Sequence, residues 1–208
     1  MIALTSFIKI LKDSGVTDKL VIEAMCNVDR TKFLEPVLQQ YAWQNQTLPI
    51  GNGQTISLPS MVGLMTQALE LKSSDKVLEI GTGCGYQSII LANLCSQVYS
   101  VERHPSLLKL AKKRFKDMQV YNIMAIVDDG SCGFLNQEPF DKIILTCCAI
   151  DIPMHLVDKL KVGGIMVVPV GESDEKQDLL KIIKLQDKID IIEIGKVDFV
   201  PMLEGIGS

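Results

Sequence analysis

The stretch that decides the fold reads Val77-Leu78-Glu79-Ile80-Gly81-Thr82-Gly83-Cys84-Gly85. A short apolar run ends in three closely spaced glycines, and a helical pattern follows over Gln87–Leu94. Glycines let the chain turn sharply after a strand and let a ligand approach the backbone closely. The N-terminus of the next helix points to the same place. On its own the pattern also fits a purely structural strand–helix turn, so it needs support from the rest of the chain.

Apolar strand patterns alternate with amphipathic helical patterns beyond this stretch. The predicted strands are Val98–Val101, Ile123–Val127, Phe140–Cys147 and Ile165–Val170, with helices at Pro105–Phe115 and near Ile152–Leu160. Two more apolar runs, Leu179–Leu185 and Ile189–Val197, predict a terminal strand pair. The alternation favours an α/β fold, a doubly wound and mostly parallel Rossmann-like sheet covered by helices on both faces.

The residues before this core predict a helical cap. In chain order they are a helix over 4–11 closed by Gly15, a helix capped by Asp18, an aperiodic stretch at 29–59, and a helix over Ser60–Leu71. An aperiodic stretch of that length inside a compact chain is usually a functional loop. We therefore expect one domain over 1–208, with a cap and substrate loop at 1–72 and a cofactor-binding core at 73–208.

Composition excludes several classes of partner. The 208 residues are 47% hydrophobic and 22% charged with a net charge of −4, which is typical of a globular chain that does not bind duplex nucleic acid. A basic cluster at 109–116 has helical spacing and fits a solvated helix face. No apolar run has the length of a membrane span, and the N-terminus does not resemble a signal peptide. We expect a cytoplasmic monomer with no nucleic-acid or membrane partner.

The cysteines give no sign of a metal site. They are Cys26, Cys84, Cys95, Cys132, Cys147 and Cys148. No two of them have CxxC spacing, and the two histidines stand in no metal-ligand pattern. We expect reduced thiols, most of them buried as small apolar side chains, and no bound metal.

Acidic residues follow successive predicted strands. Glu102 ends the second strand, where a carboxylate can accept hydrogen bonds from both ribose hydroxyls of a nucleoside. Glu79 fits poorly beside a pyrophosphate and better beside a ligand with an ammonium and a sulfonium group. Asp129 could hold an adenine amino group, or it could simply cap a turn. Together with the glycines, these positions predict an S-adenosylmethionine site.

A second motif narrows the class of enzyme. The run Leu48-Pro49-Ile50-Gly51-Asn52-Gly53-Gln54-Thr55-Ile56-Ser57 precedes a helix and the glycine-rich stretch. This combination resembles the protein-L-isoaspartate O-methyltransferases, a family of class I methyltransferases. Further similar stretches lie at 98–103, 139–141, 160–164, 168–171 and 199–201, so the resemblance covers roughly 15–203.

The resemblance implies a repair reaction on damaged proteins. The family methylates the free α-carboxylate of L-isoaspartyl residues, which arise from asparagine deamidation or aspartate isomerisation. The products are S-adenosylhomocysteine and a methyl ester, which collapses to a succinimide and partly returns to aspartate. The residues then expected to bind the cofactor are Glu79, Gly81, Thr82, Gly83, Gly85, Glu102, Arg103, Asp129 and Gly130.

This chemistry needs few catalytic side chains. A carboxylate with an ordinary pKa of about 3.9 is already ionised at neutral pH, so no general base is required. What remains is alignment of the carboxylate with the methyl group and exclusion of water. By resemblance, the Ser57 hydroxyl donates to the substrate carboxylate, and Thr55 and Gln54 shape the same loop. Without the resemblance, Ser57 would fit a cap or turn equally well. Ser57 and Thr55 are the predicted catalytic residues.

The sequence also departs from the usual family pattern. The departures are Asp29, Leu58, Asp128, Asp198 and the pair Cys147-Cys148. Asp198 stands where arginine is common, and an acid that points into the site would disfavour an anionic substrate. These changes leave the cofactor prediction intact and bear on the acceptor.

Three alternatives remain open at this point. The chain could methylate another acceptor, but Thr146-Cys147-Cys148-Ala149 stands where amino-methylating nucleic-acid enzymes carry Asn/Asp-Pro-Pro-aromatic. It could be a degenerate member that binds S-adenosylmethionine or a damaged peptide without turnover, which the intact Ser57 disfavours and which Asp128 and Asp198 favour. A nicotinamide dehydrogenase is the weakest alternative, because the glycine spacing is G-x-G-x-G.

Overall fold

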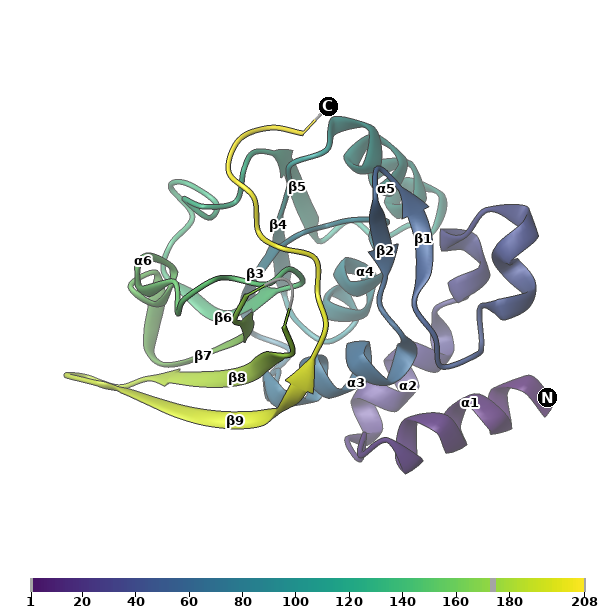
Figure 1. The fold of residues 1–208 in the computed structure, drawn as a ribbon, viewed down its shortest axis with the longest axis horizontal. Helices are drawn as coiled ribbons and strands as arrows, with labels where there is room; N and C mark the ends of the chain where they lie inside the picture. The colour runs from purple at the N-terminus through teal and green to yellow at the C-terminus, as the bar shows by residue number, and fades with distance from the viewer. Residues whose placement is uncertain (1, 173–174, 208) are drawn as a thin grey trace.

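A seven-stranded sheet runs through the centre of the computed structural model, which describes residues 2–172 and 175–207 (Figure 1). In spatial order the strands are β5 (Ile123–Val127), β4 (Gln97–Glu102), β3 (Lys76–Ile80), β6 (Phe140–Leu145), β7 (Leu160–Val170), β8 (Gln177–Lys184) and β9 (Ile189–Val197). The first five are parallel, and β8 pairs antiparallel with both β7 and β9. The predicted fold class and the terminal strand pair are confirmed.

The chain reverses its direction of winding at β3. This strand pairs with β4 on one side and β6 on the other, so the connections that follow leave in opposite directions. Val77, Leu78 and Ile80 are buried, as expected for a strand covered on both faces. Ligands of doubly wound folds bind at this switch point, beyond the carboxyl ends of the strands.

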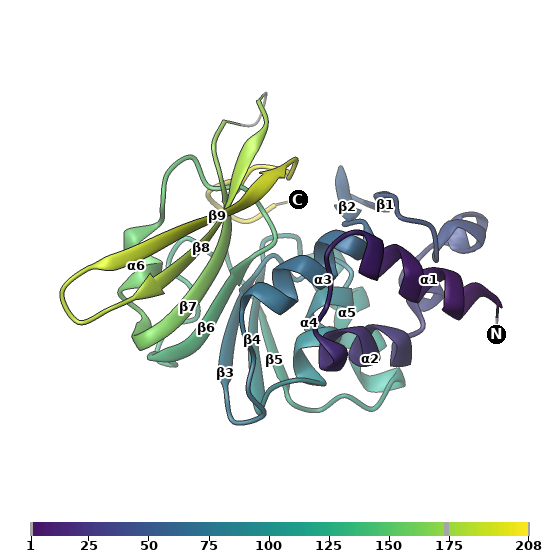
Figure 2. The same ribbon diagram turned by 90° about the horizontal axis from the view of Figure 1, so that it is seen from below.

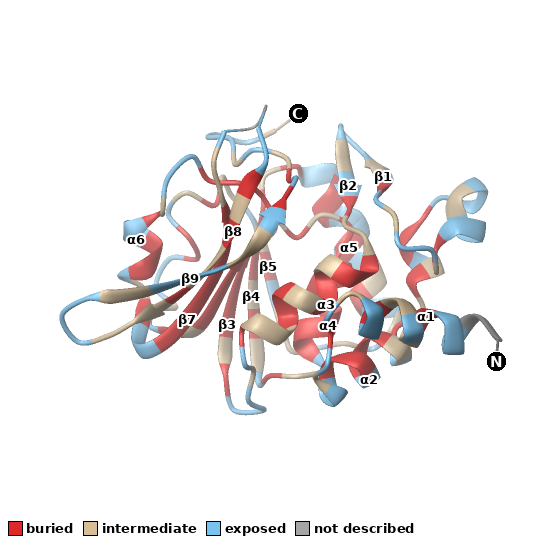
Figure 3. Cartoon of the chain, turned by 60° about the horizontal axis from the view of Figure 1, so that its bottom comes forward, coloured by how far each residue is buried: buried red, intermediate tan, exposed pale blue. Residues whose placement is uncertain are grey.

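The helices cover the two faces of the sheet unequally. They are α1 (Ile2–Asp13), α2 (Lys19–Asn27), α3 (Pro59–Ala68), α4 (Tyr86–Ala92), α5 (Pro105–Asp117) and α6 (Met154–Val157). Figure 2 shows α1 to α5 gathered on one face, with α6 on the other. Side chains of the N-terminal helices, among them Phe7 and Met25, share one apolar core with Ile89 and Phe115 of α4 and α5. Burial is accordingly concentrated on the strands and on the inner sides of the helices (Figure 3).

The stretch at 29–59 is more ordered than predicted. It contains the short 3₁₀ helices η1 (Arg30–Phe33) and η2 (Pro36–Tyr41), and the hairpin of β1 (Leu48–Gly51) with β2 (Gln54–Ile56). The description of 29–59 as an irregular loop is therefore wrong. These elements are too short for an apolar period to be visible in the sequence.

Two helix boundaries also differ from the prediction. The helix expected near 152–160 is only α6, because Pro153 stands at its N-cap and Leu160 already belongs to β7. The helix expected over 60–71 ends at Ala68, and Glu70 turns the chain with a φ of 53°. The Asp18 cap is confirmed, since its carboxylate accepts from the amides of Leu20 and Val21. A bilayer crossing would need a longer apolar helix than any in the described part of the chain.

Candidate functional site

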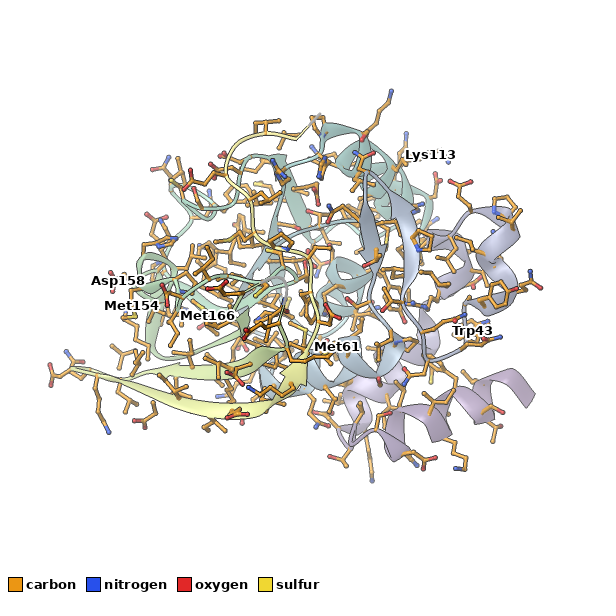
Figure 4. All side chains as sticks on the ribbon, viewed as in Figure 1. Trp43, Met61, Lys113, Met154, Asp158 and Met166 are labelled. Atoms are coloured by element: carbon orange, nitrogen blue, oxygen red, sulfur yellow. The ribbon has the colours of Figure 1, made fainter. Side chains whose placement is uncertain are left out.

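A cavity of about 830 Å³ opens at the switch point of the sheet. Its walls come from the β1–β2 hairpin, the start of α3, the glycine-rich turn after β3, the ends of β4 to β6, and the chain around and after the end of β9. The hairpin and the segment after β9, residues 198–207 (the C-terminal segment), lie near one another in Figures 1 and 2. In Figure 4, Met61 of α3 lies beside the end of β9, and both line the cavity.

The cavity collects most of the predicted cofactor residues. It is lined by Gly81, Thr82, Gly83, Glu102, Arg103 and Asp129, whereas Glu79, Gly85 and Gly130 are absent from its lining. Gly85 instead allows close packing, because a Cβ there would lie 2.6 Å from the Phe115 ring. Gly85 therefore allows α4 to pack closely against α5.

The first glycine of the turn after β3, Gly81, has no space for a side chain. Gly81 has a φ of +98°, and a Cβ there would lie 2.2 Å from Oγ1 of Thr146. That hydroxyl donates to the carbonyl of Gly81 at 2.6 Å and contacts that of Ile80 at 3.0 Å, which ties β3 to the chain after β6. The bare backbone of this turn therefore forms one wall of the cavity.

Glu102 holds the cavity wall from the neighbouring strand. One carboxylate oxygen accepts from the amide of Gly83 at 2.7 Å, and the other accepts from the amide of His104 at 2.9 Å. Its side chain is almost fully buried but reaches the cavity surface. Because each carboxylate oxygen has a second lone pair, Glu102 can still accept hydroxyl hydrogen bonds from a ligand.

Glu79 lies behind the turn rather than in the cavity. It is completely buried, and one of its oxygens accepts from the hydroxyls of Ser88 on α4 and Ser100 on β4. Burial raises the pKa of this carboxyl to about 7, partly offset by the two hydroxyl bonds. Glu79 therefore connects β3, β4 and α4, and it does not line the cavity.

The surroundings of Asp129 fit both of its predicted roles, a turn cap and an acceptor for an adenine amino group. Its carboxylate accepts from the backbone and the hydroxyl of Ser131 at 2.8 and 2.6 Å, which is the geometry of a turn cap. These bonds lower the pKa of Asp129. Asp129 and Asp128 also line the cavity, so a polar edge is present where an adenine amino group was predicted.

The C-terminal segment is the part of the site that the sequence did not reveal. Arg103 donates to the carbonyls of Glu204 and Gly205, and the amide of Gly207 donates to the carbonyl of Arg103. Leu203 of this segment lines the cavity. The segment has no periodic pattern, and its backbone groups carry no signature in the sequence.

The acceptor side of the cavity is built by the hairpin and α3. Ser57 and Thr55 both line the cavity. The N-cap of α3 is Leu58, and the Ser57 hydroxyl makes no hydrogen bond within the described residues, so the interpretation of Ser57 as a helix cap is wrong. Its carbonyl oxygen accepts from Nη2 of Arg30 at 2.9 Å. The backbone of Ser57 is thus fixed while its hydroxyl remains available to a ligand.

The acid at position 198 is balanced by a neighbour. Asp198 lies at the cavity wall 3.4 Å from the ammonium of Lys176, and Lys196 also contributes to the lining. The wall therefore presents both signs of charge. Asp29, another departure, caps η1 by accepting from the amide and hydroxyl of Thr31.

Comparison with known proteins identifies close relatives. A family described as Protein-L-isoaspartate(D-aspartate) O-methyltransferase matches residues 4–207. The chain is 49% identical over 202 residues to the protein-L-isoaspartate O-methyltransferase of Roseobacter denitrificans, covering 97% of this chain and 95% of that relative. It is 50% identical over 202 residues to that of Ruegeria sp. strain TM1040, with coverage of 97% and 94%.

Solved structures share the fold. One protein-L-isoaspartate O-methyltransferase superposes with a TM-score of 0.86 at 24% identity, covering 98% of this chain and 67% of that one. A Plasmodium falciparum protein titled a protein-L-isoaspartate O-methyltransferase, in complex with S-adenosyl-L-homocysteine, gives 0.80 at 25% identity, with coverage of 95% and 97%. Within the described residues, no cluster of His, Cys, Asp and Glu could hold a metal ion.

Proposed function

The chain belongs to the protein-L-isoaspartate(D-aspartate) O-methyltransferase family, and from this premise we propose that it methylates the free α-carboxylate of L-isoaspartyl residues in damaged proteins. S-adenosylmethionine supplies a methyl group activated on a sulfonium. One observation carries the proposal: a single cavity joins the glycine turn and Glu102 to the Ser57 hydroxyl. Donor and acceptor can therefore lie side by side in one cavity.

The donor half of the cavity fits an adenosyl group. Gly81 and Gly83 offer bare backbone, and Glu102 offers carboxylate lone pairs at the end of β4. Asp128 and Asp129 supply acceptors for an exocyclic amine at the end of β5. Apolar walls from Ile80 and Val101 surround these few polar groups, as is usual for a nucleoside site.

In the acceptor half of the cavity, the substrate carboxylate needs to be oriented more than it needs to be activated. The isoaspartyl carboxylate is ionised at neutral pH and is itself the nucleophile. The Ser57 hydroxyl donates to it and fixes the direction of one oxygen, while Thr55 shapes the adjoining hairpin. Burial raises the pKa of the Cys147 thiol to about 12, so this nearby sulfur stays protonated and does not compete for the methyl group.

The proposal extends to the organisation and setting of the chain. We propose one domain, with a cap and substrate loop at 1–72 and a cofactor-binding core at 73–208, acting as a cytoplasmic monomer. The apolar core shared by the N-terminal helices with α4 and α5 supports the single domain. The net charge of −4 supports a protein without a nucleic-acid partner. Lys113 of α5 points outward and pairs with Asp117 (Figure 4), as expected of a solvated helix face.

The repair outcome tests the proposed function. An isoaspartyl peptide incubated with the protein and S-adenosylmethionine should convert gradually into its aspartyl form through a succinimide, as followed by chromatography. Conversion should stop when S-adenosylmethionine is left out. A peptide that stays isoaspartyl through prolonged incubation with fresh S-adenosylmethionine would contradict the proposal.

A further inference from the structure

Arg30 is the largest completely buried side chain among the described residues. A guanidinium in the interior is costly unless specific partners hold it. Nη2 donates to the carbonyl oxygen of Ser57 at 2.9 Å, and the guanidinium carbon lies 5.0 Å from the centre of the Tyr86 ring, while Nε and Nη1 make no hydrogen bond within the described residues. The Arg30 side chain thus binds the backbone of Ser57, the residue predicted to orient the substrate carboxylate.

The Tyr86 contact leads to the donor side of the same cavity. Tyr86 is the first residue of α4, directly after the glycine turn, and it lines the cavity. The ring of Phe33, at the other end of η1, meets the Tyr86 ring edge-on at 5.1 Å. Arg114 adds a second connection by donating to the carbonyls of Lys32 and Cys84. The helix η1 is therefore anchored to the glycine turn at 81–85, which we call the donor loop, and Arg30 extends from η1 to Ser57.

We propose that Arg30 is a positioning residue that sets the Ser57 hydroxyl at a fixed place relative to the donor loop. The inference rests on the proposed function. Holding the Ser57 carbonyl fixes the adjoining peptide plane and, with it, the direction in which the side chain leaves the backbone. A displacement of the hydroxyl by about 1 Å would lower the rate roughly 100-fold, because in-line transfer depends steeply on alignment.

Three variants test the proposal. Arg30→Met keeps an unbranched, somewhat shorter side chain and removes the donors, and Arg30→Lys keeps the charge without the planar fork. Lys32→Met is the matched control, since it removes an exposed cation from the same helix. We expect kcat for an isoaspartyl peptide to fall about 10- to 100-fold in Arg30→Met and less in Arg30→Lys. Lys32→Met should match the wild type, and S-adenosylhomocysteine affinity, measured by calorimetry, should stay within about 2-fold throughout.

A double-mutant comparison separates positioning from general stability. In a Ser57→Ala background there is no hydroxyl to place, so adding Arg30→Met should lower kcat by less than about 2-fold. An equal fold-loss in both backgrounds, or a parallel loss of S-adenosylhomocysteine affinity, would overturn the proposal. Full kcat in Arg30→Met would do the same. If Arg30→Met does not fold, Arg30→Lys tests the proposal through the same measurements, kcat in both backgrounds and S-adenosylhomocysteine affinity.

Failure of the proposed function can be distinguished from failure of the role proposed for Arg30. Wild-type protein that binds S-adenosylhomocysteine and methylates no isoaspartyl peptide would overturn the proposed function and the role of Arg30 together. If the wild-type protein is active and the Arg30 variants have the same kcat, only the role of Arg30 is overturned.

Discussion

Replacing Glu79 with glutamine tests how the structure uses a buried acid at the centre of the sheet. The carboxyl is fully buried, and its pKa rises from an ordinary 4.5 to about 7 because burial disfavours the ionised form. Such a difference between the folded and unfolded pKa values corresponds to about 3 kcal/mol of folding free energy.

The sign of the effect follows from the direction of the pKa change. Since the folded pKa is the higher one, the stabilising contribution of Glu79 is fully present below about pH 4.5 and is lost as the pH rises to about 7. Glutamine has a similar shape, stays neutral and can still accept from the hydroxyls of Ser88 and Ser100. Glu79→Gln should therefore match the wild type near pH 4 and exceed its stability by about 3 kcal/mol near pH 8.

Urea unfolding at a series of pH values measures this difference. The protein has one tryptophan, Trp43, which packs edge-on against Phe7 of the core, so its fluorescence should report the transition. Glu70→Gln is a control of opposite sign, because a bond from Lys181 lowers the pKa of Glu70. That variant should lose stability at neutral pH and approach the wild type in acid. A difference between Glu79→Gln and wild type that is independent of pH would refute the raised pKa.

Three further substitutions probe the cavity. Ser57→Ala should lower kcat about 10- to 100-fold and leave S-adenosylhomocysteine affinity unchanged, because it removes a donor to the acceptor carboxylate alone; equal kcat would remove Ser57 from the mechanism. Glu102→Ala should weaken S-adenosylhomocysteine binding about 10-fold or more in calorimetry, since it removes ribose acceptors and the partner of the Gly83 amide; unchanged affinity would show the ribose assignment to be wrong. Gly81→Ala should lower both Tm and S-adenosylhomocysteine affinity, because its Cβ would lie 2.2 Å from the Thr146 hydroxyl. Adding Thr146→Ala should restore only part of this loss, since the positive φ remains strained, and complete recovery would contradict that reasoning.

The parts of the fold that were predictable are those with a regular pattern. Strands buried on both faces appear as continuous apolar runs, so β3 and its parallel neighbours could be placed from the sequence. The carboxyl ends of parallel strands meet at one edge, which is why Glu102 and the glycine turn reach the same cavity. The same logic could have indicated that Glu79 is buried, because every position of a doubly covered strand lies in the interior.

The parts that escaped prediction depend on short elements or on backbone groups. Asn52-Gly53 is a turn signal, and both residues have positive φ in the hairpin, so this element could have been found. The 3₁₀ helix that carries Arg30 is four residues long and shows no period. The placement of the C-terminal segment relies on hydrogen bonds between Arg103 and carbonyl groups, which every residue possesses. Neither the burial of Arg30 nor the contact at Gly205 leaves a mark in the sequence.

The most direct measurement offers the protein two peptides that differ only in the linkage of one aspartate. Wild-type protein, labelled S-adenosylmethionine and an L-isoaspartyl peptide are incubated beside the same reaction with the L-aspartyl twin. Label should accumulate on the isoaspartyl peptide alone and should be released by mild base, as expected of a methyl ester. Base-stable label, equal labelling of both peptides, or no label on either despite measured S-adenosylhomocysteine binding would contradict isoaspartyl carboxyl methylation as the function of this chain.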